Sequence, residues 1–479
     1  MHYSAQKCRF LSSPVGATKI AKLCVGLALI ILSGGLWAAP ESDSAPLLIR
    51  NVSPVDAKHG LMPPQDVLIS AGHITAMGQD LVAPPGVRIV DGQDRFLTPG
   101  LWDMHVHLSY DSRFIDIMPD LFLDYGITSV RDTGGDLKRL KPILASLYGP
   151  DRAAPRVFFA GPLLDGSPVV YGADDESGIG QSHLTTAQAR SKVETLAKAG
   201  VDFIKIYEMV SPEVFEAFTT AASAHNLPIA AHVPLAMLAS DVGPKVQSME
   251  HLRNVELDCA HNADSLLRER RALLKAGQDQ AGMSLRSSIH HAQRDSAIQN
   301  EDPARCERVL TSLSNTIQVP TARLNAMTQY PPFGQSDWGI ALDALPEAVR
   351  SEWIKAPSYM DPTRYKITGE WTLDMIPRLA AHNISIGAGT DTPIGWAIPG
   401  YSLHRELEVL VAAGLDTQRA LAAATLVPAS FFGLQDSLGQ VSAGYEADLL
   451  LLDANPLEDI RHSRQIRLVI SRGKVVRSQ

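Results

Sequence analysis

Two histidines separated by one residue, His105 and His107, have a spacing suited to metal binding. In a β-strand, residues i and i+2 point to the same side, so both imidazoles can reach one ion. Two solvated or helix-capping histidines would give the same pattern. The pair therefore gains meaning only if further ligands occur elsewhere in the chain.

Lys205 lies in a strand-like run, where period-2 alternation puts Phe203, Lys205 and Tyr207 on one face. If that face points into a barrel, the lysine is buried, which is costly unless it is paired or chemically modified. Carboxylation by CO2 would give an anionic carbamate able to bridge two metal ions. The alternative is an ordinary ion pair with a carboxylate such as Asp132 or Asp391.

Three more potential ligands end later strand-like runs: His232, His251 and Asp391. Each alone is more often structural than functional. Together with His105, His107 and Lys205 they form a set of six side chains at or near the ends of different strands. Imidazole and carboxylate ligands suit zinc or a similar divalent ion, and Asp391 could also accept a proton during catalysis.

Strand-like and helical stretches alternate through the middle of the chain. This rhythm predicts a parallel sheet with helices outside, and eight such units predict an α/β fold of the (β/α)8 TIM-like barrel type. We expect the barrel over residues 96–437, with a helical insertion over about 258–312. Both ends of the chain are rich in short strands, so we expect one small β-sandwich domain built from residues 39–95 and 438–479.

Residues 1–38 combine basic side chains, an apolar run of about ten residues and a small-residue end, as in a secretory signal peptide. An uncleaved N-terminal anchor is the alternative. We expect a periplasmic or secreted protein with no membrane contact after cleavage. Cys259 and Cys306 would then be its two cysteines, and their places near the two ends of the insertion predict a disulfide.

The chain has 479 residues, 45% hydrophobic and 20% charged, with a formal net charge of −9. This is globular composition, and the acidic balance argues against nucleic-acid binding. We expect a small-molecule substrate, and a homo-oligomer is left open.

The ordered motifs resemble the amidohydrolase superfamily, specifically its imidazolonepropionase-like and prolidase-like metal-dependent hydrolases, over nearly all of the mature chain. The matching stretches are residues 99–107, 126–135, 203–207, 249–251, 389–391, 443–450 and 455–460. The resemblance implies that His105, His107 and Asp391 hold one metal and that His232 and His251 hold a second. It also implies two divalent ions, expected to be zinc, bridged by carboxylated Lys205, because imidazolonepropionase proper lacks that lysine.

The implied reaction is hydrolysis of an amide bond in a dipeptide or N-acyl amino acid by a metal-bridging hydroxide, with Asp391 as the catalytic proton acceptor. The alternatives are a lactonase or esterase on the same binuclear site, a mononuclear imidazolonepropionase-like cyclic amidohydrolase, and a non-catalytic binding protein.

Expected substrate contacts are Tyr171, Tyr207, Arg253 and His404. Arg253 could hold a carboxylate bidentately, although a surface arginine is the alternative. For His404 a helix-cap or packing role is favoured over substrate contact, and the pair His290 and His291 is read as part of the polar insertion. Prolidase-like relatives often carry a Gly-Gly-His-Gly stretch after the third strand. Residues 161–172 contain no histidine, so the resemblance leaves the substrate open.

Overall fold

The computed structural model describes residues 45–478, except 150, 173–176, 362 and 364. The predicted signal peptide, residues 1–38, lies outside these described residues. Within them, no helix combines the length and apolar character needed to cross a membrane.

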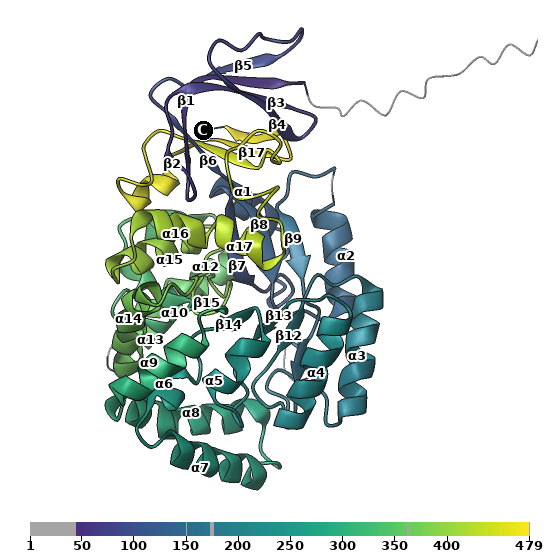
Figure 1. Ribbon diagram of the computed structural model, residues 1–479, viewed down its shortest axis with the longest axis vertical. Helices are drawn as coiled ribbons and strands as arrows, with labels where there is room; N and C mark the ends of the chain where they lie inside the picture. The colour runs from purple at the N-terminus through teal and green to yellow at the C-terminus, as the bar shows by residue number, and fades with distance from the viewer. Residues whose placement is uncertain (1–44, 150, 173–176, 362, 364, 479) are drawn as a thin grey trace, which may run out of the picture. The chain divides into compact units, whose positions relative to one another are not determined.

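Strands from the two ends of the chain lie side by side in one nine-stranded sheet (Figure 1). β16 (Leu449–Leu452) pairs antiparallel with β6 (Phe96–Pro99), which neighbours β1 (Leu47–Asp56). The other strands are β2 (Gly60–Leu61), β3 (Gln65–Ser70), β4 (His73–Gly78), β5 (Arg88–Asp91), β17 (Ile466–Ser471) and β18 (Lys474–Ser478). Strand alternation divides the leucines of β16 between two cores, because neighbouring side chains point to opposite faces. Leu449 and Leu451 pack within the sheet region, whereas Leu450 and Leu452 join the main core.

A second set of strands runs parallel through the middle of the chain. It forms two sheets. One contains β7 (Leu101–Val106), β8 (Ile127–Asp132) and β9 (Arg156–Phe159), and the other contains, in spatial order, β11 (Gly180–Ser182), β10 (Leu163–Asp165), β12 (Ile204–Ile206), β13 (Ile229–Ala231), β14 (Ser248–Glu250) and β15 (Ile317–Val319). Residues 384–392 connect the two ends of this set, since Ile386 bridges Gln318 of β15 and Thr392 bridges Val106 of β7, both in parallel. Parallel pairing brings the carboxyl ends of the strands to one edge, where the residues that follow them can meet.

Helices connect and cover these strands. They are α1 (Met118–Asp124), α2 (Leu137–Leu147), α3 (Thr186–Ala199), α4 (Pro212–Ala224), α5 (Ala239–Val242), η1 (Gly243–Lys245), α15 (Tyr401–Ala412), α16 (Thr417–Ala423), α17 (Leu426–Phe431) and η3 (Ile460–Arg464). The bounds of α3 follow from its sequence. Thr185 and Gln188 form a capping box at its start, and Gly200 adopts the left-handed conformation at its end.

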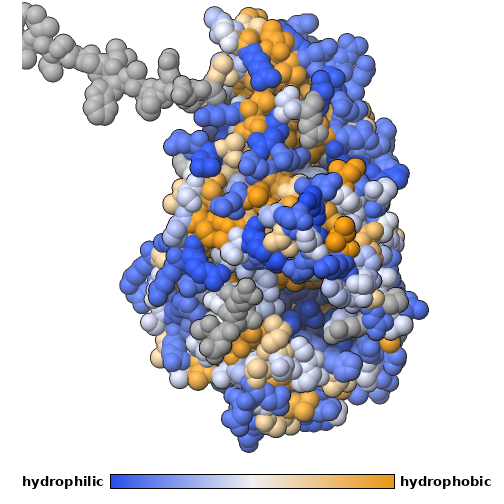
Figure 2. Space-filling model, turned by 180° about the vertical axis from the view of Figure 1, so that it is seen from behind, coloured by the Kyte–Doolittle hydropathy of each residue, from blue (hydrophilic) through white to orange (hydrophobic). Residues whose placement is uncertain are grey.

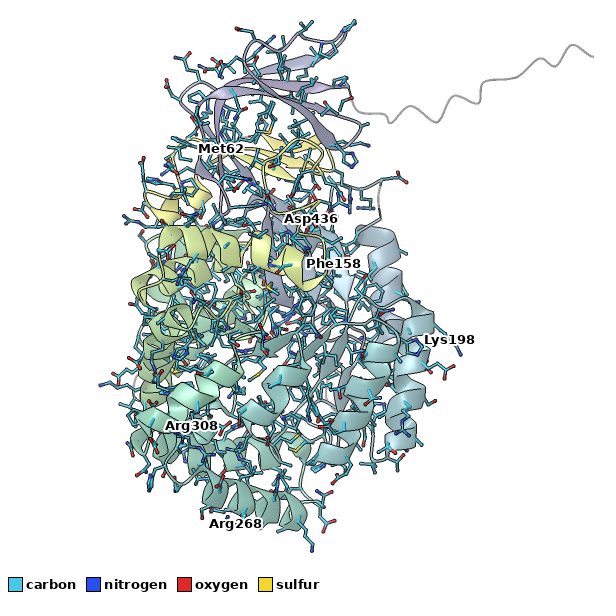
Figure 3. The ribbon with its side chains drawn as sticks, in the orientation of Figure 1. Met62, Phe158, Lys198, Arg268, Arg308 and Asp436 are labelled. Atoms are coloured by element: carbon cyan, nitrogen blue, oxygen red, sulfur yellow. A yellow bond between two sulfur atoms is a disulfide. The ribbon has the colours of Figure 1, made fainter. Side chains whose placement is uncertain are left out.

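Between β14 and β15 the chain forms the predicted helical insertion, which lies at the opposite end of Figure 1 from the nine-stranded sheet. Its helices are α6 (Val255–Cys259), α7 (Ala263–Ala276), α8 (Gly282–Gln299) and α9 (Pro303–Ser312). The predicted disulfide is confirmed: Cys259 of α6 bonds to Cys306 of α9, and both are buried. In contrast, Arg268 of α7 and Arg308 of α9 are exposed (Figure 3).

A further helical stretch follows β15, which the sequence reading did not separate from the regular strand–helix rhythm. It contains α10 (Ala322–Asn325), η2 (Pro332–Gly334), α11 (Trp338–Asp343), α12 (Glu347–Trp353), α13 (Ala356–Tyr359) and α14 (Lys366–Ala381). Hydrophilic residues cover much of the face shown in Figure 2, as the charged composition leads us to expect. Along the chain, one helical stretch thus precedes β15 and another follows it.

Candidate metal centre and substrate cavity

One cavity of about 720 Å³ collects the residues at the carboxyl ends of the parallel strands. All six predicted metal-binding residues line it: His105, His107, Lys205, His232, His251 and Asp391. His105 and Lys205 lie within β7 and β12, and the other four follow directly after strands or the segment at 384–388. The topology therefore brings together side chains separated by almost 290 positions in sequence.

His105, His107 and Asp391 form the tightest potential ligand group among the described residues. Oδ1 of Asp391 lies 3.3 Å from Nε2 of His105 and 3.1 Å from Nε2 of His107. Asp391 has a positive φ of 62°, an uncommon backbone conformation that turns its carboxylate toward the two rings. Asp103 supports this turn by accepting hydrogen bonds from the backbone N–H groups of His105 and Thr390.

The hydrogen bonds of three histidines fix their tautomers. Nδ1 of His105 and of His232 each lies 2.7 Å from a buried glutamate oxygen, and Nδ1 of His107 lies 3.2 Å from the carbonyl of Gly134. Carboxylate and carbonyl oxygens only accept, so each Nδ1 must donate. When such a ring is neutral, its Nε2 carries the lone pair that a metal requires.

His251 has the same tautomer, which follows from two linked hydrogen bonds. Its Nδ1 lies 2.6 Å from Oγ1 of Thr321, whose own hydroxyl donates to the carbonyl of Pro320 at 2.7 Å. Since that hydroxyl proton is already used, Thr321 accepts from His251. The ring lies near those of His105 and His232, with centroid separations of 4.6 and 4.7 Å. All four histidines thus keep Nε2 available.

The protonation states of the groups in the cavity floor favour binding of a cation. Burial together with neighbouring positive charge lowers the pKa of His232 to about 3 and that of His251 well below its ordinary value, so both rings are neutral. Burial alone would raise the pKa of Asp391, but His105 and His107 hold it well below its usual range, and Asp391 in turn raises the pKa of His107 against the effect of burial. Three acceptor atoms, Nε2 of His105, Nε2 of His107 and Oδ1 of Asp391, therefore converge where only a proton or a metal ion can relieve their repulsion.

Lys205 is buried, with 1% of its surface exposed, and burial lowers the pKa of its amine to about 8. Its Nζ has no hydrogen-bond partner among the described residues. The alternative of an ion pair with Asp132 or Asp391 is not realised. Asp132 instead accepts from the backbone N–H groups of Leu108 and Gly134.

Of the expected substrate contacts, Tyr171, Tyr207 and Arg253 line the cavity. The ring of Tyr207 lies 4.4 Å from that of His232 between centroids.

His404 does not line the cavity, and its position fits the packing role that the sequence favoured over substrate contact. It lies in α15, where Ser463 Oγ contacts Nδ1 at 2.8 Å and the carbonyl of Tyr125 accepts from Nε2 at 2.9 Å. The ring packs α15 against neighbouring segments, because its helix turns it toward η3 and away from the strand ends.

The sequence reading missed the wall that α8 contributes to the cavity. Arg286, His290 and Arg294 are spaced by four residues, so they share one helix face, and all three line the cavity. His291 lines it as well, which corrects the reading of His290 and His291 as a plain polar segment. The spacing of four was a usable signal, but it does not say which way the face points.

Two buried glutamates, Glu208 and Glu250, organise the surroundings of the histidines. Glu250 contacts His105 and Arg131, and Glu208 contacts His232, Arg286 and His290. Burial alone would raise the pKa of each carboxyl, but the adjacent arginine and the other bound cationic or N–H groups lower it well below its ordinary value. Both glutamates are therefore anionic acceptors.

Comparison with known proteins gives consistent matches. A model of the amidohydrolase family matches residues 359–476. The dihydroorotase of Pelobacter propionicus is 47% identical over 62 residues, and the chain spans 15% of the length of this relative. The imidazolonepropionase of Colwellia psychrerythraea is 22% identical over 400 residues, which cover 81% of this chain and 84% of that protein. A solved Xaa-Pro dipeptidase with bound methionine superposes with a TM-score of 0.62 at 19% identity, covering 91% of this chain and 100% of that one. That likeness establishes a shared α/β fold.

Proposed function

We propose, from the premise that the chain belongs to the amidohydrolase superfamily, that it is a metal-dependent hydrolase acting on amide bonds of carboxylate-bearing substrates. A dipeptide or an N-acyl amino acid is the substrate class that the cavity suits best. We also infer that the parallel strands close through residues 384–392 into a (β/α)8 barrel, with the nine-stranded sheet as a β-sandwich domain.

The observation that carries this proposal is the convergence of acceptor atoms. Nε2 of His105 and Nε2 of His107 lie 3.3 and 3.1 Å from Oδ1 of Asp391, and the hydrogen bonds at Nδ1 leave each Nε2 facing that carboxylate. A buried carboxylate and two imidazoles in this arrangement favour a cation between them, and a metal ion can take the place that a proton on Nε2 would otherwise hold. The donor set of imidazole and carboxylate is the one that zinc prefers.

A second divalent ion would be held by His232 and His251, with carboxylated Lys205 between the two positions. The fit rests on the unpartnered Nζ and on a pKa of about 8 for Lys205, which leaves an appreciable neutral fraction at neutral pH. A neutral amine can add CO2, releasing one proton and forming a carbamate with two oxygen ligands. When bound, such ions would polarise the scissile carbonyl and lower the pKa of water.

The chain itself supplies proton transfer and orientation. Asp391 would accept the proton of the attacking water at its carboxylate and deliver it to the leaving nitrogen. Tyr171 and Tyr207 form the wall beside His232 and limit the space open to the substrate. Because the cavity floor is buried, water has restricted access once substrate fills it.

Arg253 is the residue we assign to the substrate carboxylate. The other two cavity arginines already have carboxylate partners: Arg286 pairs with Glu208 and Arg294 with Glu256. Arg253 has no ion-pair partner among the described residues, and its buried Nε lacks a hydrogen bond. One uncompensated guanidinium suits one carboxylate, which it can bind bidentately.

We further propose that the protein is exported, with residues 1–38 as its signal. The support is the N-terminal composition together with the Cys259–Cys306 disulfide, a bond that persists in oxidising compartments. Detection of the intact N-terminus in a cytoplasmic fraction would contradict this.

The test of function is a hydrolysis screen of zinc-loaded protein against dipeptides, N-acyl amino acids and lactones, each with a carboxylate and a carboxamide version. We expect turnover of amides that carry a free carboxylate and much weaker turnover of the carboxamides. Preferential turnover of lactones or other esters would replace the amidase assignment. A chain that binds less than one divalent ion at neutral pH would contradict the metal-dependent mechanism.

A further inference from the structure

Glu208 connects the cavity floor to the helical insertion. Its Oε1 accepts hydrogen bonds from Nδ1 of His232 at 2.7 Å and from an Nη of Arg286 at 2.8 Å, and its Oε2 accepts from Nε2 of His290 at 2.6 Å. The glutamate is fully buried, and Arg286 and His290 lie one helical turn apart on α8. Thus one side chain binds both a predicted metal ligand and the insertion.

The corresponding contact on the other side of the cavity involves no insertion residue. Glu250 accepts from Nδ1 of His105 at 2.7 Å, from Arg131 at 2.8 Å and from Oγ of Ser248 at 2.8 Å. Its cationic partner Arg131 lies in β8, within the parallel strands. The two histidines therefore have equivalent glutamate acceptors, but only that of His232 depends on α8.

We infer that Glu208 is a positioning residue through which helix α8 controls metal binding at His232 and His251, while leaving the position at His105, His107 and Asp391 unaffected. This inference rests on the proposed metal-dependent function. The contact fixes the His232 tautomer and ring orientation, and such outer contacts typically change metal affinity by about 10–100-fold. The insertion would then be a structural requirement for the second metal position.

Helix α8 is itself held by contacts unrelated to the metal ligands. Nε of Arg294 donates to Glu256 of α6 at 2.7 Å, and Nε of Arg270 in α7 donates to Gln293 at 2.8 Å. The disulfide between α6 and α9 closes the same segment. Movement of the insertion would therefore be transmitted to His232 through Arg286, His290 and Glu208.

The experiment measures zinc per chain, by elemental analysis after dialysis against a graded series of chelator concentrations, for wild-type protein, Glu208→Gln and Arg286→Met. Ser287→Ala is the matched control, because Ser287 is exposed on α8 beside Arg286 and is outside the Glu208 network. We expect wild type and the control to retain two ions. Glu208→Gln should lose one ion at about 10–100-fold lower chelator strength, and Arg286→Met should change in the same direction by less.

Two ions retained at wild-type affinity in both variants would overturn the inference. If Glu208→Gln does not fold, Arg286→Met decides alone, because Arg286 lies at the cavity wall with 12% of its side chain exposed. A single ion in wild type that Glu208→Gln leaves unchanged would also overturn it. Wild type that binds no zinc would instead contradict the proposed function, so the two failures are distinguishable.

Discussion

On each of the two sides of the cavity floor, a buried glutamate accepts a hydrogen bond from a histidine, but different parts of the fold hold the two glutamates in place. At His105, the buried Glu250 is held by Arg131 and Ser248, all from parallel strands. At His232, the buried Glu208 is held by Arg286 and His290, both from the helical insertion. The first side depends on the core of the fold, whereas the second depends on how an inserted helix docks. The comparison suggests that the second side can be altered without unfolding the protein.

The largest expected effect on activity comes from replacing Asp391. Asp391→Asn keeps the shape but removes the proton acceptor, so we expect kcat to fall by about 10²–10⁴-fold. Steady-state kinetics at saturating zinc measure this, with zinc content determined in parallel. Asp361→Asn is the control, since Asp361 is an exposed carboxylate at the same cavity. An unchanged kcat in Asp391→Asn would exclude Asp391 as the proton acceptor.

Lys205 lies between the two sides, and its replacement tests whether they share a bridging ligand. Lys205→Ala should lose zinc and activity together, because the bridging carbamate is absent. Short-chain carboxylic acids should restore part of both by filling the vacated space. Lys205→Arg should not be rescued, since a guanidinium cannot form the carbamate and repels the metals. An unmodified ammonium at Lys205 in a high-resolution map of metal-loaded protein would rule out the binuclear arrangement.

The free energies of unfolding of two metal-free variants, Glu250→Gln and Glu208→Gln, test whether the two glutamates contribute differently to stability. Glu250→Gln leaves Arg131 without its carboxylate at 0% exposure, and breaking such a buried pair costs about 3–5 kcal/mol of unfolding free energy. Glu208→Gln should cost less, because Arg286 is partly exposed to the cavity. Urea unfolding of both metal-free variants measures the difference. Equal losses would show that both sides belong equally to the folded core.

The smallest expected effect concerns substrate recognition by Arg253. Arg253→Lys keeps a positive charge but loses the planar fork, so we expect kcat/KM for carboxylate substrates to fall by about ten- to hundredfold, equivalent to one charged hydrogen bond of about 1.5–3 kcal/mol. The carboxamide versions of the same substrates are the control and should be nearly unaffected. Equal losses for both substrate types, or none for either in Arg253→Ala, would argue against carboxylate binding here.

The sequence by itself determined much of the candidate metal site of this protein. Strand alternation and the positions of His105, His107, His232, His251 and Asp391 at strand ends were readable, because parallel strands bring their carboxyl ends to one edge whatever joins them. The pairing of Cys259 with Cys306 was also predictable from their places at the two ends of one segment.

Only the tertiary structure decided what surrounds the candidate metal ligands. The spacing of Arg286, His290 and Arg294 defines a helix face, but the docking of α8 determines that this face meets Glu208 and not solvent. His404 shows the converse, since it follows the 384–392 segment in sequence but contacts Ser463 and the Tyr125 carbonyl, outside the cavity. The physical reason is that local periodicity fixes which residues share a face, whereas the direction of that face depends on contacts between segments far apart in the chain.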